Sequence, residues 1–83
     1  MSPPAENEVN RRIGAWLMAQ RQARGLTFVE LAKRIGVSRQ QLMKYEQGLN
    51  AIRPHRLMRI ASVLDCDPAG ALRAAAESQD LGP

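Results

Sequence analysis

A cluster of side chains that could bind nucleic acid lies within residues 39–47, RQQLMKYEQ. Arginine and lysine offer hydrogen-bond donors, and glutamine offers both a donor and an acceptor, that match base edges in the major groove of DNA. One face of a helix would carry these side chains: Arg39, Gln40, Met43, Lys44 and Gln47. The alternative reading is the solvated polar face of an ordinary helical hairpin.

Two helix starts follow one another closely, and the second one begins this cluster. Thr27 and Glu30 form a T-x-x-E capping box, in which a hydroxyl and a carboxylate each accept a hydrogen bond from an otherwise unpaired backbone N–H. Eleven residues later, Ser38 and Gln41 form an S-x-x-Q box of the same kind. Each box is flanked by a hydrophobic pair that can close over the cap: Leu26 with Leu31, and Val37 with Leu42.

A single glycine, Gly36, separates the two starts, and glycine readily adopts the left-handed backbone that ends a helix. The pattern therefore predicts one helix over about 28–35 and a second over about 39–47. Two helices joined by so short a turn cross steeply, which leaves the second free to project.

Charge is distributed unevenly along the chain. The stretch from Arg11 to Arg59 holds eleven Lys or Arg and two acids, Glu30 and Glu46, so its net charge is +9. The rest of the chain holds one arginine and six acids, so its net charge is −5, and the two together give +4. A basic body around a projecting helix is typical of a nucleic-acid binder.

Length and composition restrict the other possibilities. Eighty-three residues allow one domain with a small core. One cysteine and one histidine argue against a disulfide framework, a metal site and a Cys–His catalytic pair. We expect a soluble, cytoplasmic protein that does not enter a membrane and needs no cofactor or small-molecule ligand, since the chain has no signal peptide and no long apolar run.

The remaining pattern is helical throughout, so the expected fold is all-α. Val9, Ile13 and Leu17 recur at helical spacing, and Pro54 suits the first turn of a fourth helix. The expected organisation is a mobile arm over 1–7, a domain over 8–78 with helices at about 8–24, 28–35, 39–47, from 54 to about 64 and 68–78, and a frayed end over 79–83.

The motifs together resemble the phage-repressor/Cro-type (XRE-like) helix-turn-helix family. They are RQARGLT, then LAKRIGVS, then YEQG, then IASVL, and the resemblance covers about residues 9–76. It implies a compact five-helix bundle of the lambda-repressor type. It also implies a transcriptional regulator that binds operator DNA, usually as a symmetric dimer on a palindromic site.

The resemblance also assigns roles to single residues. Base reading would fall to Arg39, Gln40, Met43 and Lys44, with Met43 able to touch a thymine methyl. Phosphate contacts would come from Ser38, Asn50, Arg53, Arg56 and backbone N–H groups at the start of the fourth helix. Arg21 and Glu46 would form a partly buried structural ion pair. For Gln41 we favour the capping role over base contact.

Two residues depart from the family pattern. The first residue of the second helix is often a glutamine that grips a phosphate, but here it is Phe28. Either Arg24 or Lys33 replaces that anchor, or Phe28 simply packs over the first helix. Trp16 lies off the apolar stripe of the first helix and either marks a protein contact or packs on the fifth helix.

The interpretation is a sequence-specific DNA-binding transcriptional regulator without enzymatic activity, whose partner is double-stranded DNA. The alternative is a protein-interaction module, such as an antitoxin or coactivator-like domain. We expect a homodimer built through Ala69, Leu72 and Ala76 of the fifth helix, with Trp16 as the next candidate. The competing reading is that Leu72 covers the monomer core.

Overall fold

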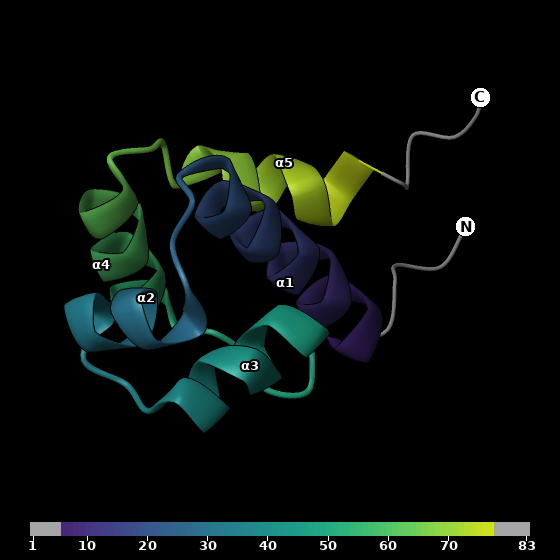
Figure 1. Cartoon of the computed structure of the whole chain (residues 1–83). Helices are drawn as coiled ribbons and strands as arrows, with labels where there is room; N and C mark the ends of the chain where they lie inside the picture. The colour runs from purple at the N-terminus through teal and green to yellow at the C-terminus, as the bar shows by residue number, and fades with distance from the viewer. Residues whose placement is uncertain (1–5, 78–83) are drawn as a thin grey trace.

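The computed structural model describes residues 6–77, which form five α-helices and no strand (Figure 1). The all-α, five-helix fold expected from the sequence is confirmed. The helices are α1 (Glu6–Ala23), α2 (Phe28–Ile35), α3 (Arg39–Gln47), α4 (Pro54–Leu64) and α5 (Ala69–Glu77).

The helices enclose one hydrophobic core. Helix α1 packs against both α3 and α5, while α2 packs against α3 and α4. Each helix from α1 to α4 places at least one large aliphatic side chain in the centre, fully removed from solvent: Leu17, Leu31, Ile35, Leu42, Ile60 and Leu64. In Figure 1, α3 lies at one end of the molecule and α5 at the other, with α1 running between them.

The cap of α2 forms in full, as its sequence predicts. Thr27 Oγ1 accepts a hydrogen bond from Glu30 N at 3.1 Å, and Glu30 Oε1 accepts one from Thr27 N at 2.9 Å. The helix ends at Gly36, whose φ of 76° is the left-handed conformation that favours glycine.

The cap of α3 forms only in part. Ser38 Oγ accepts from Gln41 N at 3.0 Å. Within residues 6–77 the Gln41 side chain accepts no hydrogen bond from Ser38 N. The prediction of a full, reciprocal capping box at α3 was therefore wrong. Gln41 is therefore free to point elsewhere.

Helix α1 begins at Glu6, earlier than the expected start at residue 8, so the arm does not include residues 6 and 7. Glu8 pairs with Arg11 and Arg12 one turn later, and such pairs stabilise the first turn of a helix. The rest of the expected arm, residues 1–5, lies outside the described residues. So do the expected last residue of the fifth helix, Ser78, and the expected frayed end over 79–83.

Helices α1 and α3 touch through their backbones. A Cβ placed on Gly14 would lie 2.4 Å from the carbonyl oxygen of Tyr45 and 2.6 Å from that of Glu46. A Cβ on Gly48, just after α3, would lie 2.5 Å from the Cα of Arg11. Only a residue without a side chain allows either approach, so these two glycines hold α3 directly on α1.

Helix α5 packs through a residue that the sequence did not single out. Ala71 is fully buried, whereas Leu72 is 65% exposed, so the reading in which Leu72 covers the core is wrong. Of the predicted interface stripe, Ala76 is also exposed and Ala69 is half-buried. The helix is tied to α1 by a hydrogen bond from Arg12 Nη1 to the carbonyl of Ala75, at 2.8 Å.

Trp16 packs on α5 and is half-buried. A Cβ on Gly70 would lie 2.8 Å from its indole Nε1, which shows how closely the ring approaches the helix. Cys66 lies beside Trp16, half-buried against the core, and this burial raises the pKa of its thiol. Of the two readings of Trp16, the structure supports packing on the fifth helix.

Candidate nucleic-acid interface

Helix α3 has one buried face and one open face. Leu42, Tyr45 and Glu46 are buried against the rest of the domain. The opposite face carries the side chains that the sequence predicted as base readers. Three of them are exposed and one is half-buried: Arg39, Gln40, Lys44 and, half-buried, Met43. The fold therefore leaves the polar cluster available to a ligand while its helix stays anchored.

A buried ion pair joins α3 to α1. Arg21 Nε lies 2.7 Å from Glu46 Oε2, and Arg21 Nη2 lies 3.1 Å from Glu46 Oε1, so the contact is bidentate. Arg21 is 9% exposed and Glu46 is 4% exposed. Arg21 also donates to the carbonyl of Leu26 at 2.9 Å. These contacts use several of the donors of the guanidinium and fix the rotation of α3 about its own axis.

Phe28 covers this ion pair. The guanidinium carbon of Arg21 lies 4.1 Å from the centre of the Phe28 ring, a distance at which a cation and an aromatic face attract each other. Phe28 is half-buried and also packs against the core. Its position at the start of α2 is thus a packing position, which accounts for an aromatic residue where the family often has glutamine.

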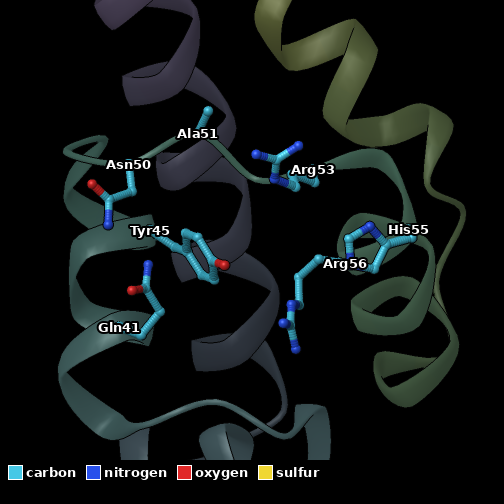
Figure 2. Close-up of a pocket in the computed structure, with 7 residues that line it drawn as sticks. All are labelled: Gln41, Tyr45, Asn50, Ala51, Arg53, His55 and Arg56. Carbon is cyan, nitrogen blue, oxygen red and sulfur yellow. The ribbon is translucent and has the colours of Figure 1, made fainter.

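A polar pocket lies between α3, the residues that follow it and the start of α4 (Figure 2). Amide side chains and the Tyr45 hydroxyl line one side, and basic side chains from α4 and the preceding residue line the other (Figure 2). The lining residues are Gln41, Tyr45, Asn50, Ala51, Arg53, His55 and Arg56. Donors thus predominate, which suits an anionic group such as a phosphate.

The backbone at the start of α4 adds to this donor set. Arg53 is the N-cap residue, and within the described part of the chain no side chain caps the first turn. Pro54 follows at the first helical position and has no N–H of its own. The N-terminal amides of α4 therefore have no side-chain cap, and the positive end of the helix dipole lies at the turn whose His55 and Arg56 line the pocket.

Two pocket residues have roles that the sequence did not reveal. The half-buried Gln41 lines the pocket, so its side chain serves the polar surface rather than the α3 cap. Arg56 Nη1 donates to the carbonyl of Ile35 at 3.2 Å, which satisfies an unpaired carbonyl at the end of α2. Arg56 thus has a structural contact besides the predicted phosphate contact. Ile35 is distant from Arg56 in the sequence, so no local motif indicated this hydrogen bond.

Arg24 has hydrogen-bond partners within the domain. Its Nε donates to the carbonyl of Leu64 at 2.6 Å, and its Nη1 donates to the backbone and side-chain oxygens of Gln20, each at 2.9 Å. These bonds hold the side chain at the end of α4, and its contact with a phosphate remains a prediction. Lys33 is exposed in the last turn of α2.

The two helix starts differ in charge. The first turn of α2 contains Glu30, and the hydrogen bond from the Thr27 backbone N–H lowers the pKa of this carboxyl below its usual range. Its carboxylate therefore neutralises the positive end of α2. The first turn of α3 carries Arg39 in place of an acid. An anionic ligand consequently meets more favourable charge at α3 than at α2.

Two other features are absent from residues 6–77. That part of the chain contains no group of three or more His, Cys, Asp or Glu side chains able to hold a metal ion. None of its helices combines the length and the apolar character needed to cross a bilayer.

Comparison with known proteins agrees with this geometry. The chain is 41% identical over 58 residues to an uncharacterised HTH-type transcriptional regulator of Rickettsia conorii, covering 70% of this chain and 46% of the relative. The chain thus spans about half the length of that curated relative. The crystal structure of the clp gene regulator ClgR from Corynebacterium glutamicum superposes with a TM-score of 0.80 at 30% identity, covering 89% of this chain and 96% of that one.

A second solved structure belongs to a controller protein. The restriction-modification controller C.AhdI from Aeromonas hydrophila gives a TM-score of 0.70 at 26% identity, covering 74% of this chain and 92% of that one. A family model described as Helix-turn-helix matches residues 17–70, from the middle of α1 to the start of α5. With the two capped helices, the buried α3 face and these relatives in agreement, the chain belongs to the helix-turn-helix family.

Proposed function

We propose that this chain is a DNA-binding transcriptional regulator that inserts α3 into the major groove of double-stranded DNA in the cytoplasm. The observation that carries the proposal is the open face of α3, which presents Arg39, Gln40 and Lys44 to solvent beside a donor-rich pocket. Base edges and phosphates of one DNA segment can occupy these two features together. The proposal includes no catalytic step, and Glu30 and Glu46, the two acids of the basic stretch, both make structural contacts.

Base reading is assigned to the open face of α3. Arg39 and Lys44 suit guanine O6 and N7, and Gln40 suits adenine N6 and N7. The buried ion pair of Arg21 with Glu46 supports this role, because it prevents α3 from rotating when DNA binds its outer face.

Phosphate contact is assigned to residues that flank α3 on both sides. On the pocket side they are Asn50, Arg53 and Arg56, joined by the uncapped backbone amides of α4. On the other side they are Ser38, at the start of α3, and Lys33, exposed at the end of α2. Phosphate contacts of this kind fix the register of a protein on DNA without reading sequence.

The working unit is proposed to be a homodimer formed through the outer face of α5. Leu72 is 65% exposed there, between the predicted partners Ala69 and Ala76. The face continues into an apolar groove between α1, α4 and α5, lined by Ile13, Ile52, Pro54, Leu57, Met58, Asp67, Pro68, Ala69 and Leu72. A dimer would present two α3 helices about 34 Å apart, one turn of DNA, to a palindromic site.

Titration of duplex DNA at increasing salt concentration tests the function. Each phosphate neutralised by the protein should steepen the plot of log affinity against log salt by a slope of roughly −0.9. A plot that is flat between low and physiological salt contradicts DNA binding through the basic surface.

Two alanine variants then separate base reading from phosphate contact. Lys44→Ala should weaken binding to the preferred site by about 1–3 kcal/mol and relax the preference at one or two base pairs. Arg53→Ala should weaken all sequences nearly equally. Arg53 suits this test better than Arg56, because Arg56 also holds the end of α2.

Arg73→Ala is the matched control, since it removes the same charge from an exposed position on α5. It should leave the base preference and most of the affinity unchanged. If Arg53→Ala altered the preferred bases while Lys44→Ala did not, the proposed docking of α3 would be wrong.

A further inference from the structure

A groove lies between the start of α2 and the outer face of α3. Thr27, Phe28 and Val29 line it from α2 and its cap, and Arg39 and Met43 line it from α3. Three of these five side chains, Phe28, Val29 and Met43, are apolar. Val29 is 50% exposed although it is aliphatic. We call this the α2–α3 groove.

The α2–α3 groove is poorly suited to a phosphate. Phe28 offers no side-chain donor and faces the Arg21 guanidinium. The backbone amides of Thr27 and Glu30 already donate within the capping box. The Glu30 carboxylate adds a negative charge at the same helix end. Arg39 is the one cationic residue of the lining and is assigned to a base edge, so an apolar group fits the rest of this groove better than an anion does.

From this arrangement we infer that the α2–α3 groove binds the C5-methyl group of a pyrimidine in the major groove, so that Val29 and Phe28 of α2 take part in base recognition with Met43. The inference rests on the proposed function, because it requires α3 to lie in the major groove. It goes beyond that function by assigning base specificity to residues outside α3.

The occupant follows from continuity with the proposed reading face. Arg39 lines the groove and is also the first residue of the reading face of α3. If Arg39 binds one base, the edge of the neighbouring base therefore lies next to the groove. The only apolar group on a base edge in the major groove of unmodified DNA is the thymine methyl, and 5-methylcytosine presents the same group. Burying one methyl group changes affinity by about fourfold.

The test uses duplexes that the purified chain itself selects from a randomised DNA library. Each thymine of the selected site is replaced singly by deoxyuracil, which removes only the methyl group. We expect wild type to lose about fourfold in affinity at one or two positions next to the base read by Arg39. In a parallel series, each cytosine is replaced by 5-methylcytosine, and a gain of similar size identifies methylcytosine as the source of the methyl.

Val29→Ala should abolish the sensitivity to deoxyuracil while the protein still selects the same site. Leu49→Ala is the matched control, because Leu49 is 66% exposed and does not line the groove. It should retain full sensitivity. Circular dichroism of both variants verifies that the fold is intact.

Several outcomes overturn the inference. If wild type selects a preferred site but tolerates every methyl removal and addition, the inference is wrong and the proposed function stands. Sensitivity that persists in Val29→Ala means that the methyl is read elsewhere. If Val29→Ala changes self-association in sedimentation and not methyl sensitivity, the groove is a protein contact. Failure of wild type to bind any duplex contradicts the proposed function as well.

Discussion

Helix α1 holds α3 and α5 by different means, and the difference separates what must be rigid from what can adjust. Against α3 the contact is backbone on backbone at Gly14, reinforced by the buried pair of Arg21 and Glu46. Against α5 the close contacts are made by side chains, the tip of Trp16 on Gly70 and Arg12 on the carbonyl of Ala75. A side-chain tip can shift by a rotamer change, but two backbones in contact cannot. The proposed reading helix is thus fixed more firmly than the proposed dimer helix.

The largest effect should follow from Glu46→Ala, which attacks the α1–α3 contact. It leaves the buried Arg21 guanidinium without its carboxylate, and the free energy of unfolding should fall by about 3–5 kcal/mol. Urea unfolding followed by circular dichroism measures this. Glu8→Ala is the control, because it removes a partly exposed ion-pair partner on α1, the helix that carries Arg21, and should leave the midpoint nearly unchanged. A Glu46→Ala midpoint equal to that of wild type would show the pair to be solvated.

Next in size should be Gly14→Ala. The added methyl meets backbone carbonyls of α3 that cannot give way, so we expect a loss of roughly 2–3 kcal/mol despite the higher helix propensity of alanine. Gly70→Ala is the matched variant on α5, where the added methyl meets the end of Trp16. It should change stability by no more than about 1 kcal/mol. Equal losses for the two variants would contradict the contrast between the two contacts.

A smaller, pH-dependent effect should come from Glu30→Gln at the start of α2. Because the pKa of Glu30 is lowered in the folded state, its ionised form stabilises the fold above its usual value of 4.5. This contribution is lost as the pH falls through the lowered pKa. Thermal melts of both proteins should therefore differ at pH 7 and converge at low pH. A difference that grows on acidification would reverse the sign and refute this role of the cap.

The smallest effect on folding should be that of Leu72→Glu. Its side chain is exposed, so the free energy of unfolding at high dilution should change by less than about 0.5 kcal/mol. The same substitution should weaken self-association in sedimentation, since it places a charge in the proposed dimer face. If the variant still binds a palindromic site two-to-one with unchanged self-association, the interface lies elsewhere.

The parts of this molecule that the sequence predicts well are those governed by near neighbours. The Thr27–Glu30 cap and the Gly36 end depend only on residues within one turn, and both have the expected geometry. The fold class follows from the same local devices repeated along the chain. The Arg21–Glu46 contact came from the family resemblance, because its two members are far apart in sequence.

Most of what the sequence missed depends on contacts between distant segments, and the unformed Gln41 half of the α3 cap is a local exception. Arg24 bonds to the carbonyl of Leu64, forty residues away, so a local motif could not indicate its direction. Gly14 looks like an ordinary helical residue until the path of α3 is known. Periodicity alone could not distinguish Leu72 from Ala71 as the buried member of α5, because a short alanine-rich helix presents similar apolar residues on several faces.

The position of α1 between α3 and α5 has a consequence for the spacing of operator half-sites. In the proposed dimer, the path from one reading helix to its symmetry mate runs through α1, then α5, in each subunit. Arg12, which donates to the carbonyl of Ala75, sets where α5 lies along α1. A change at this joint would alter the number of base pairs between the half-sites while leaving the bases read within each half-site the same. Related regulators could then differ in half-site spacing without differing in the bases that they prefer.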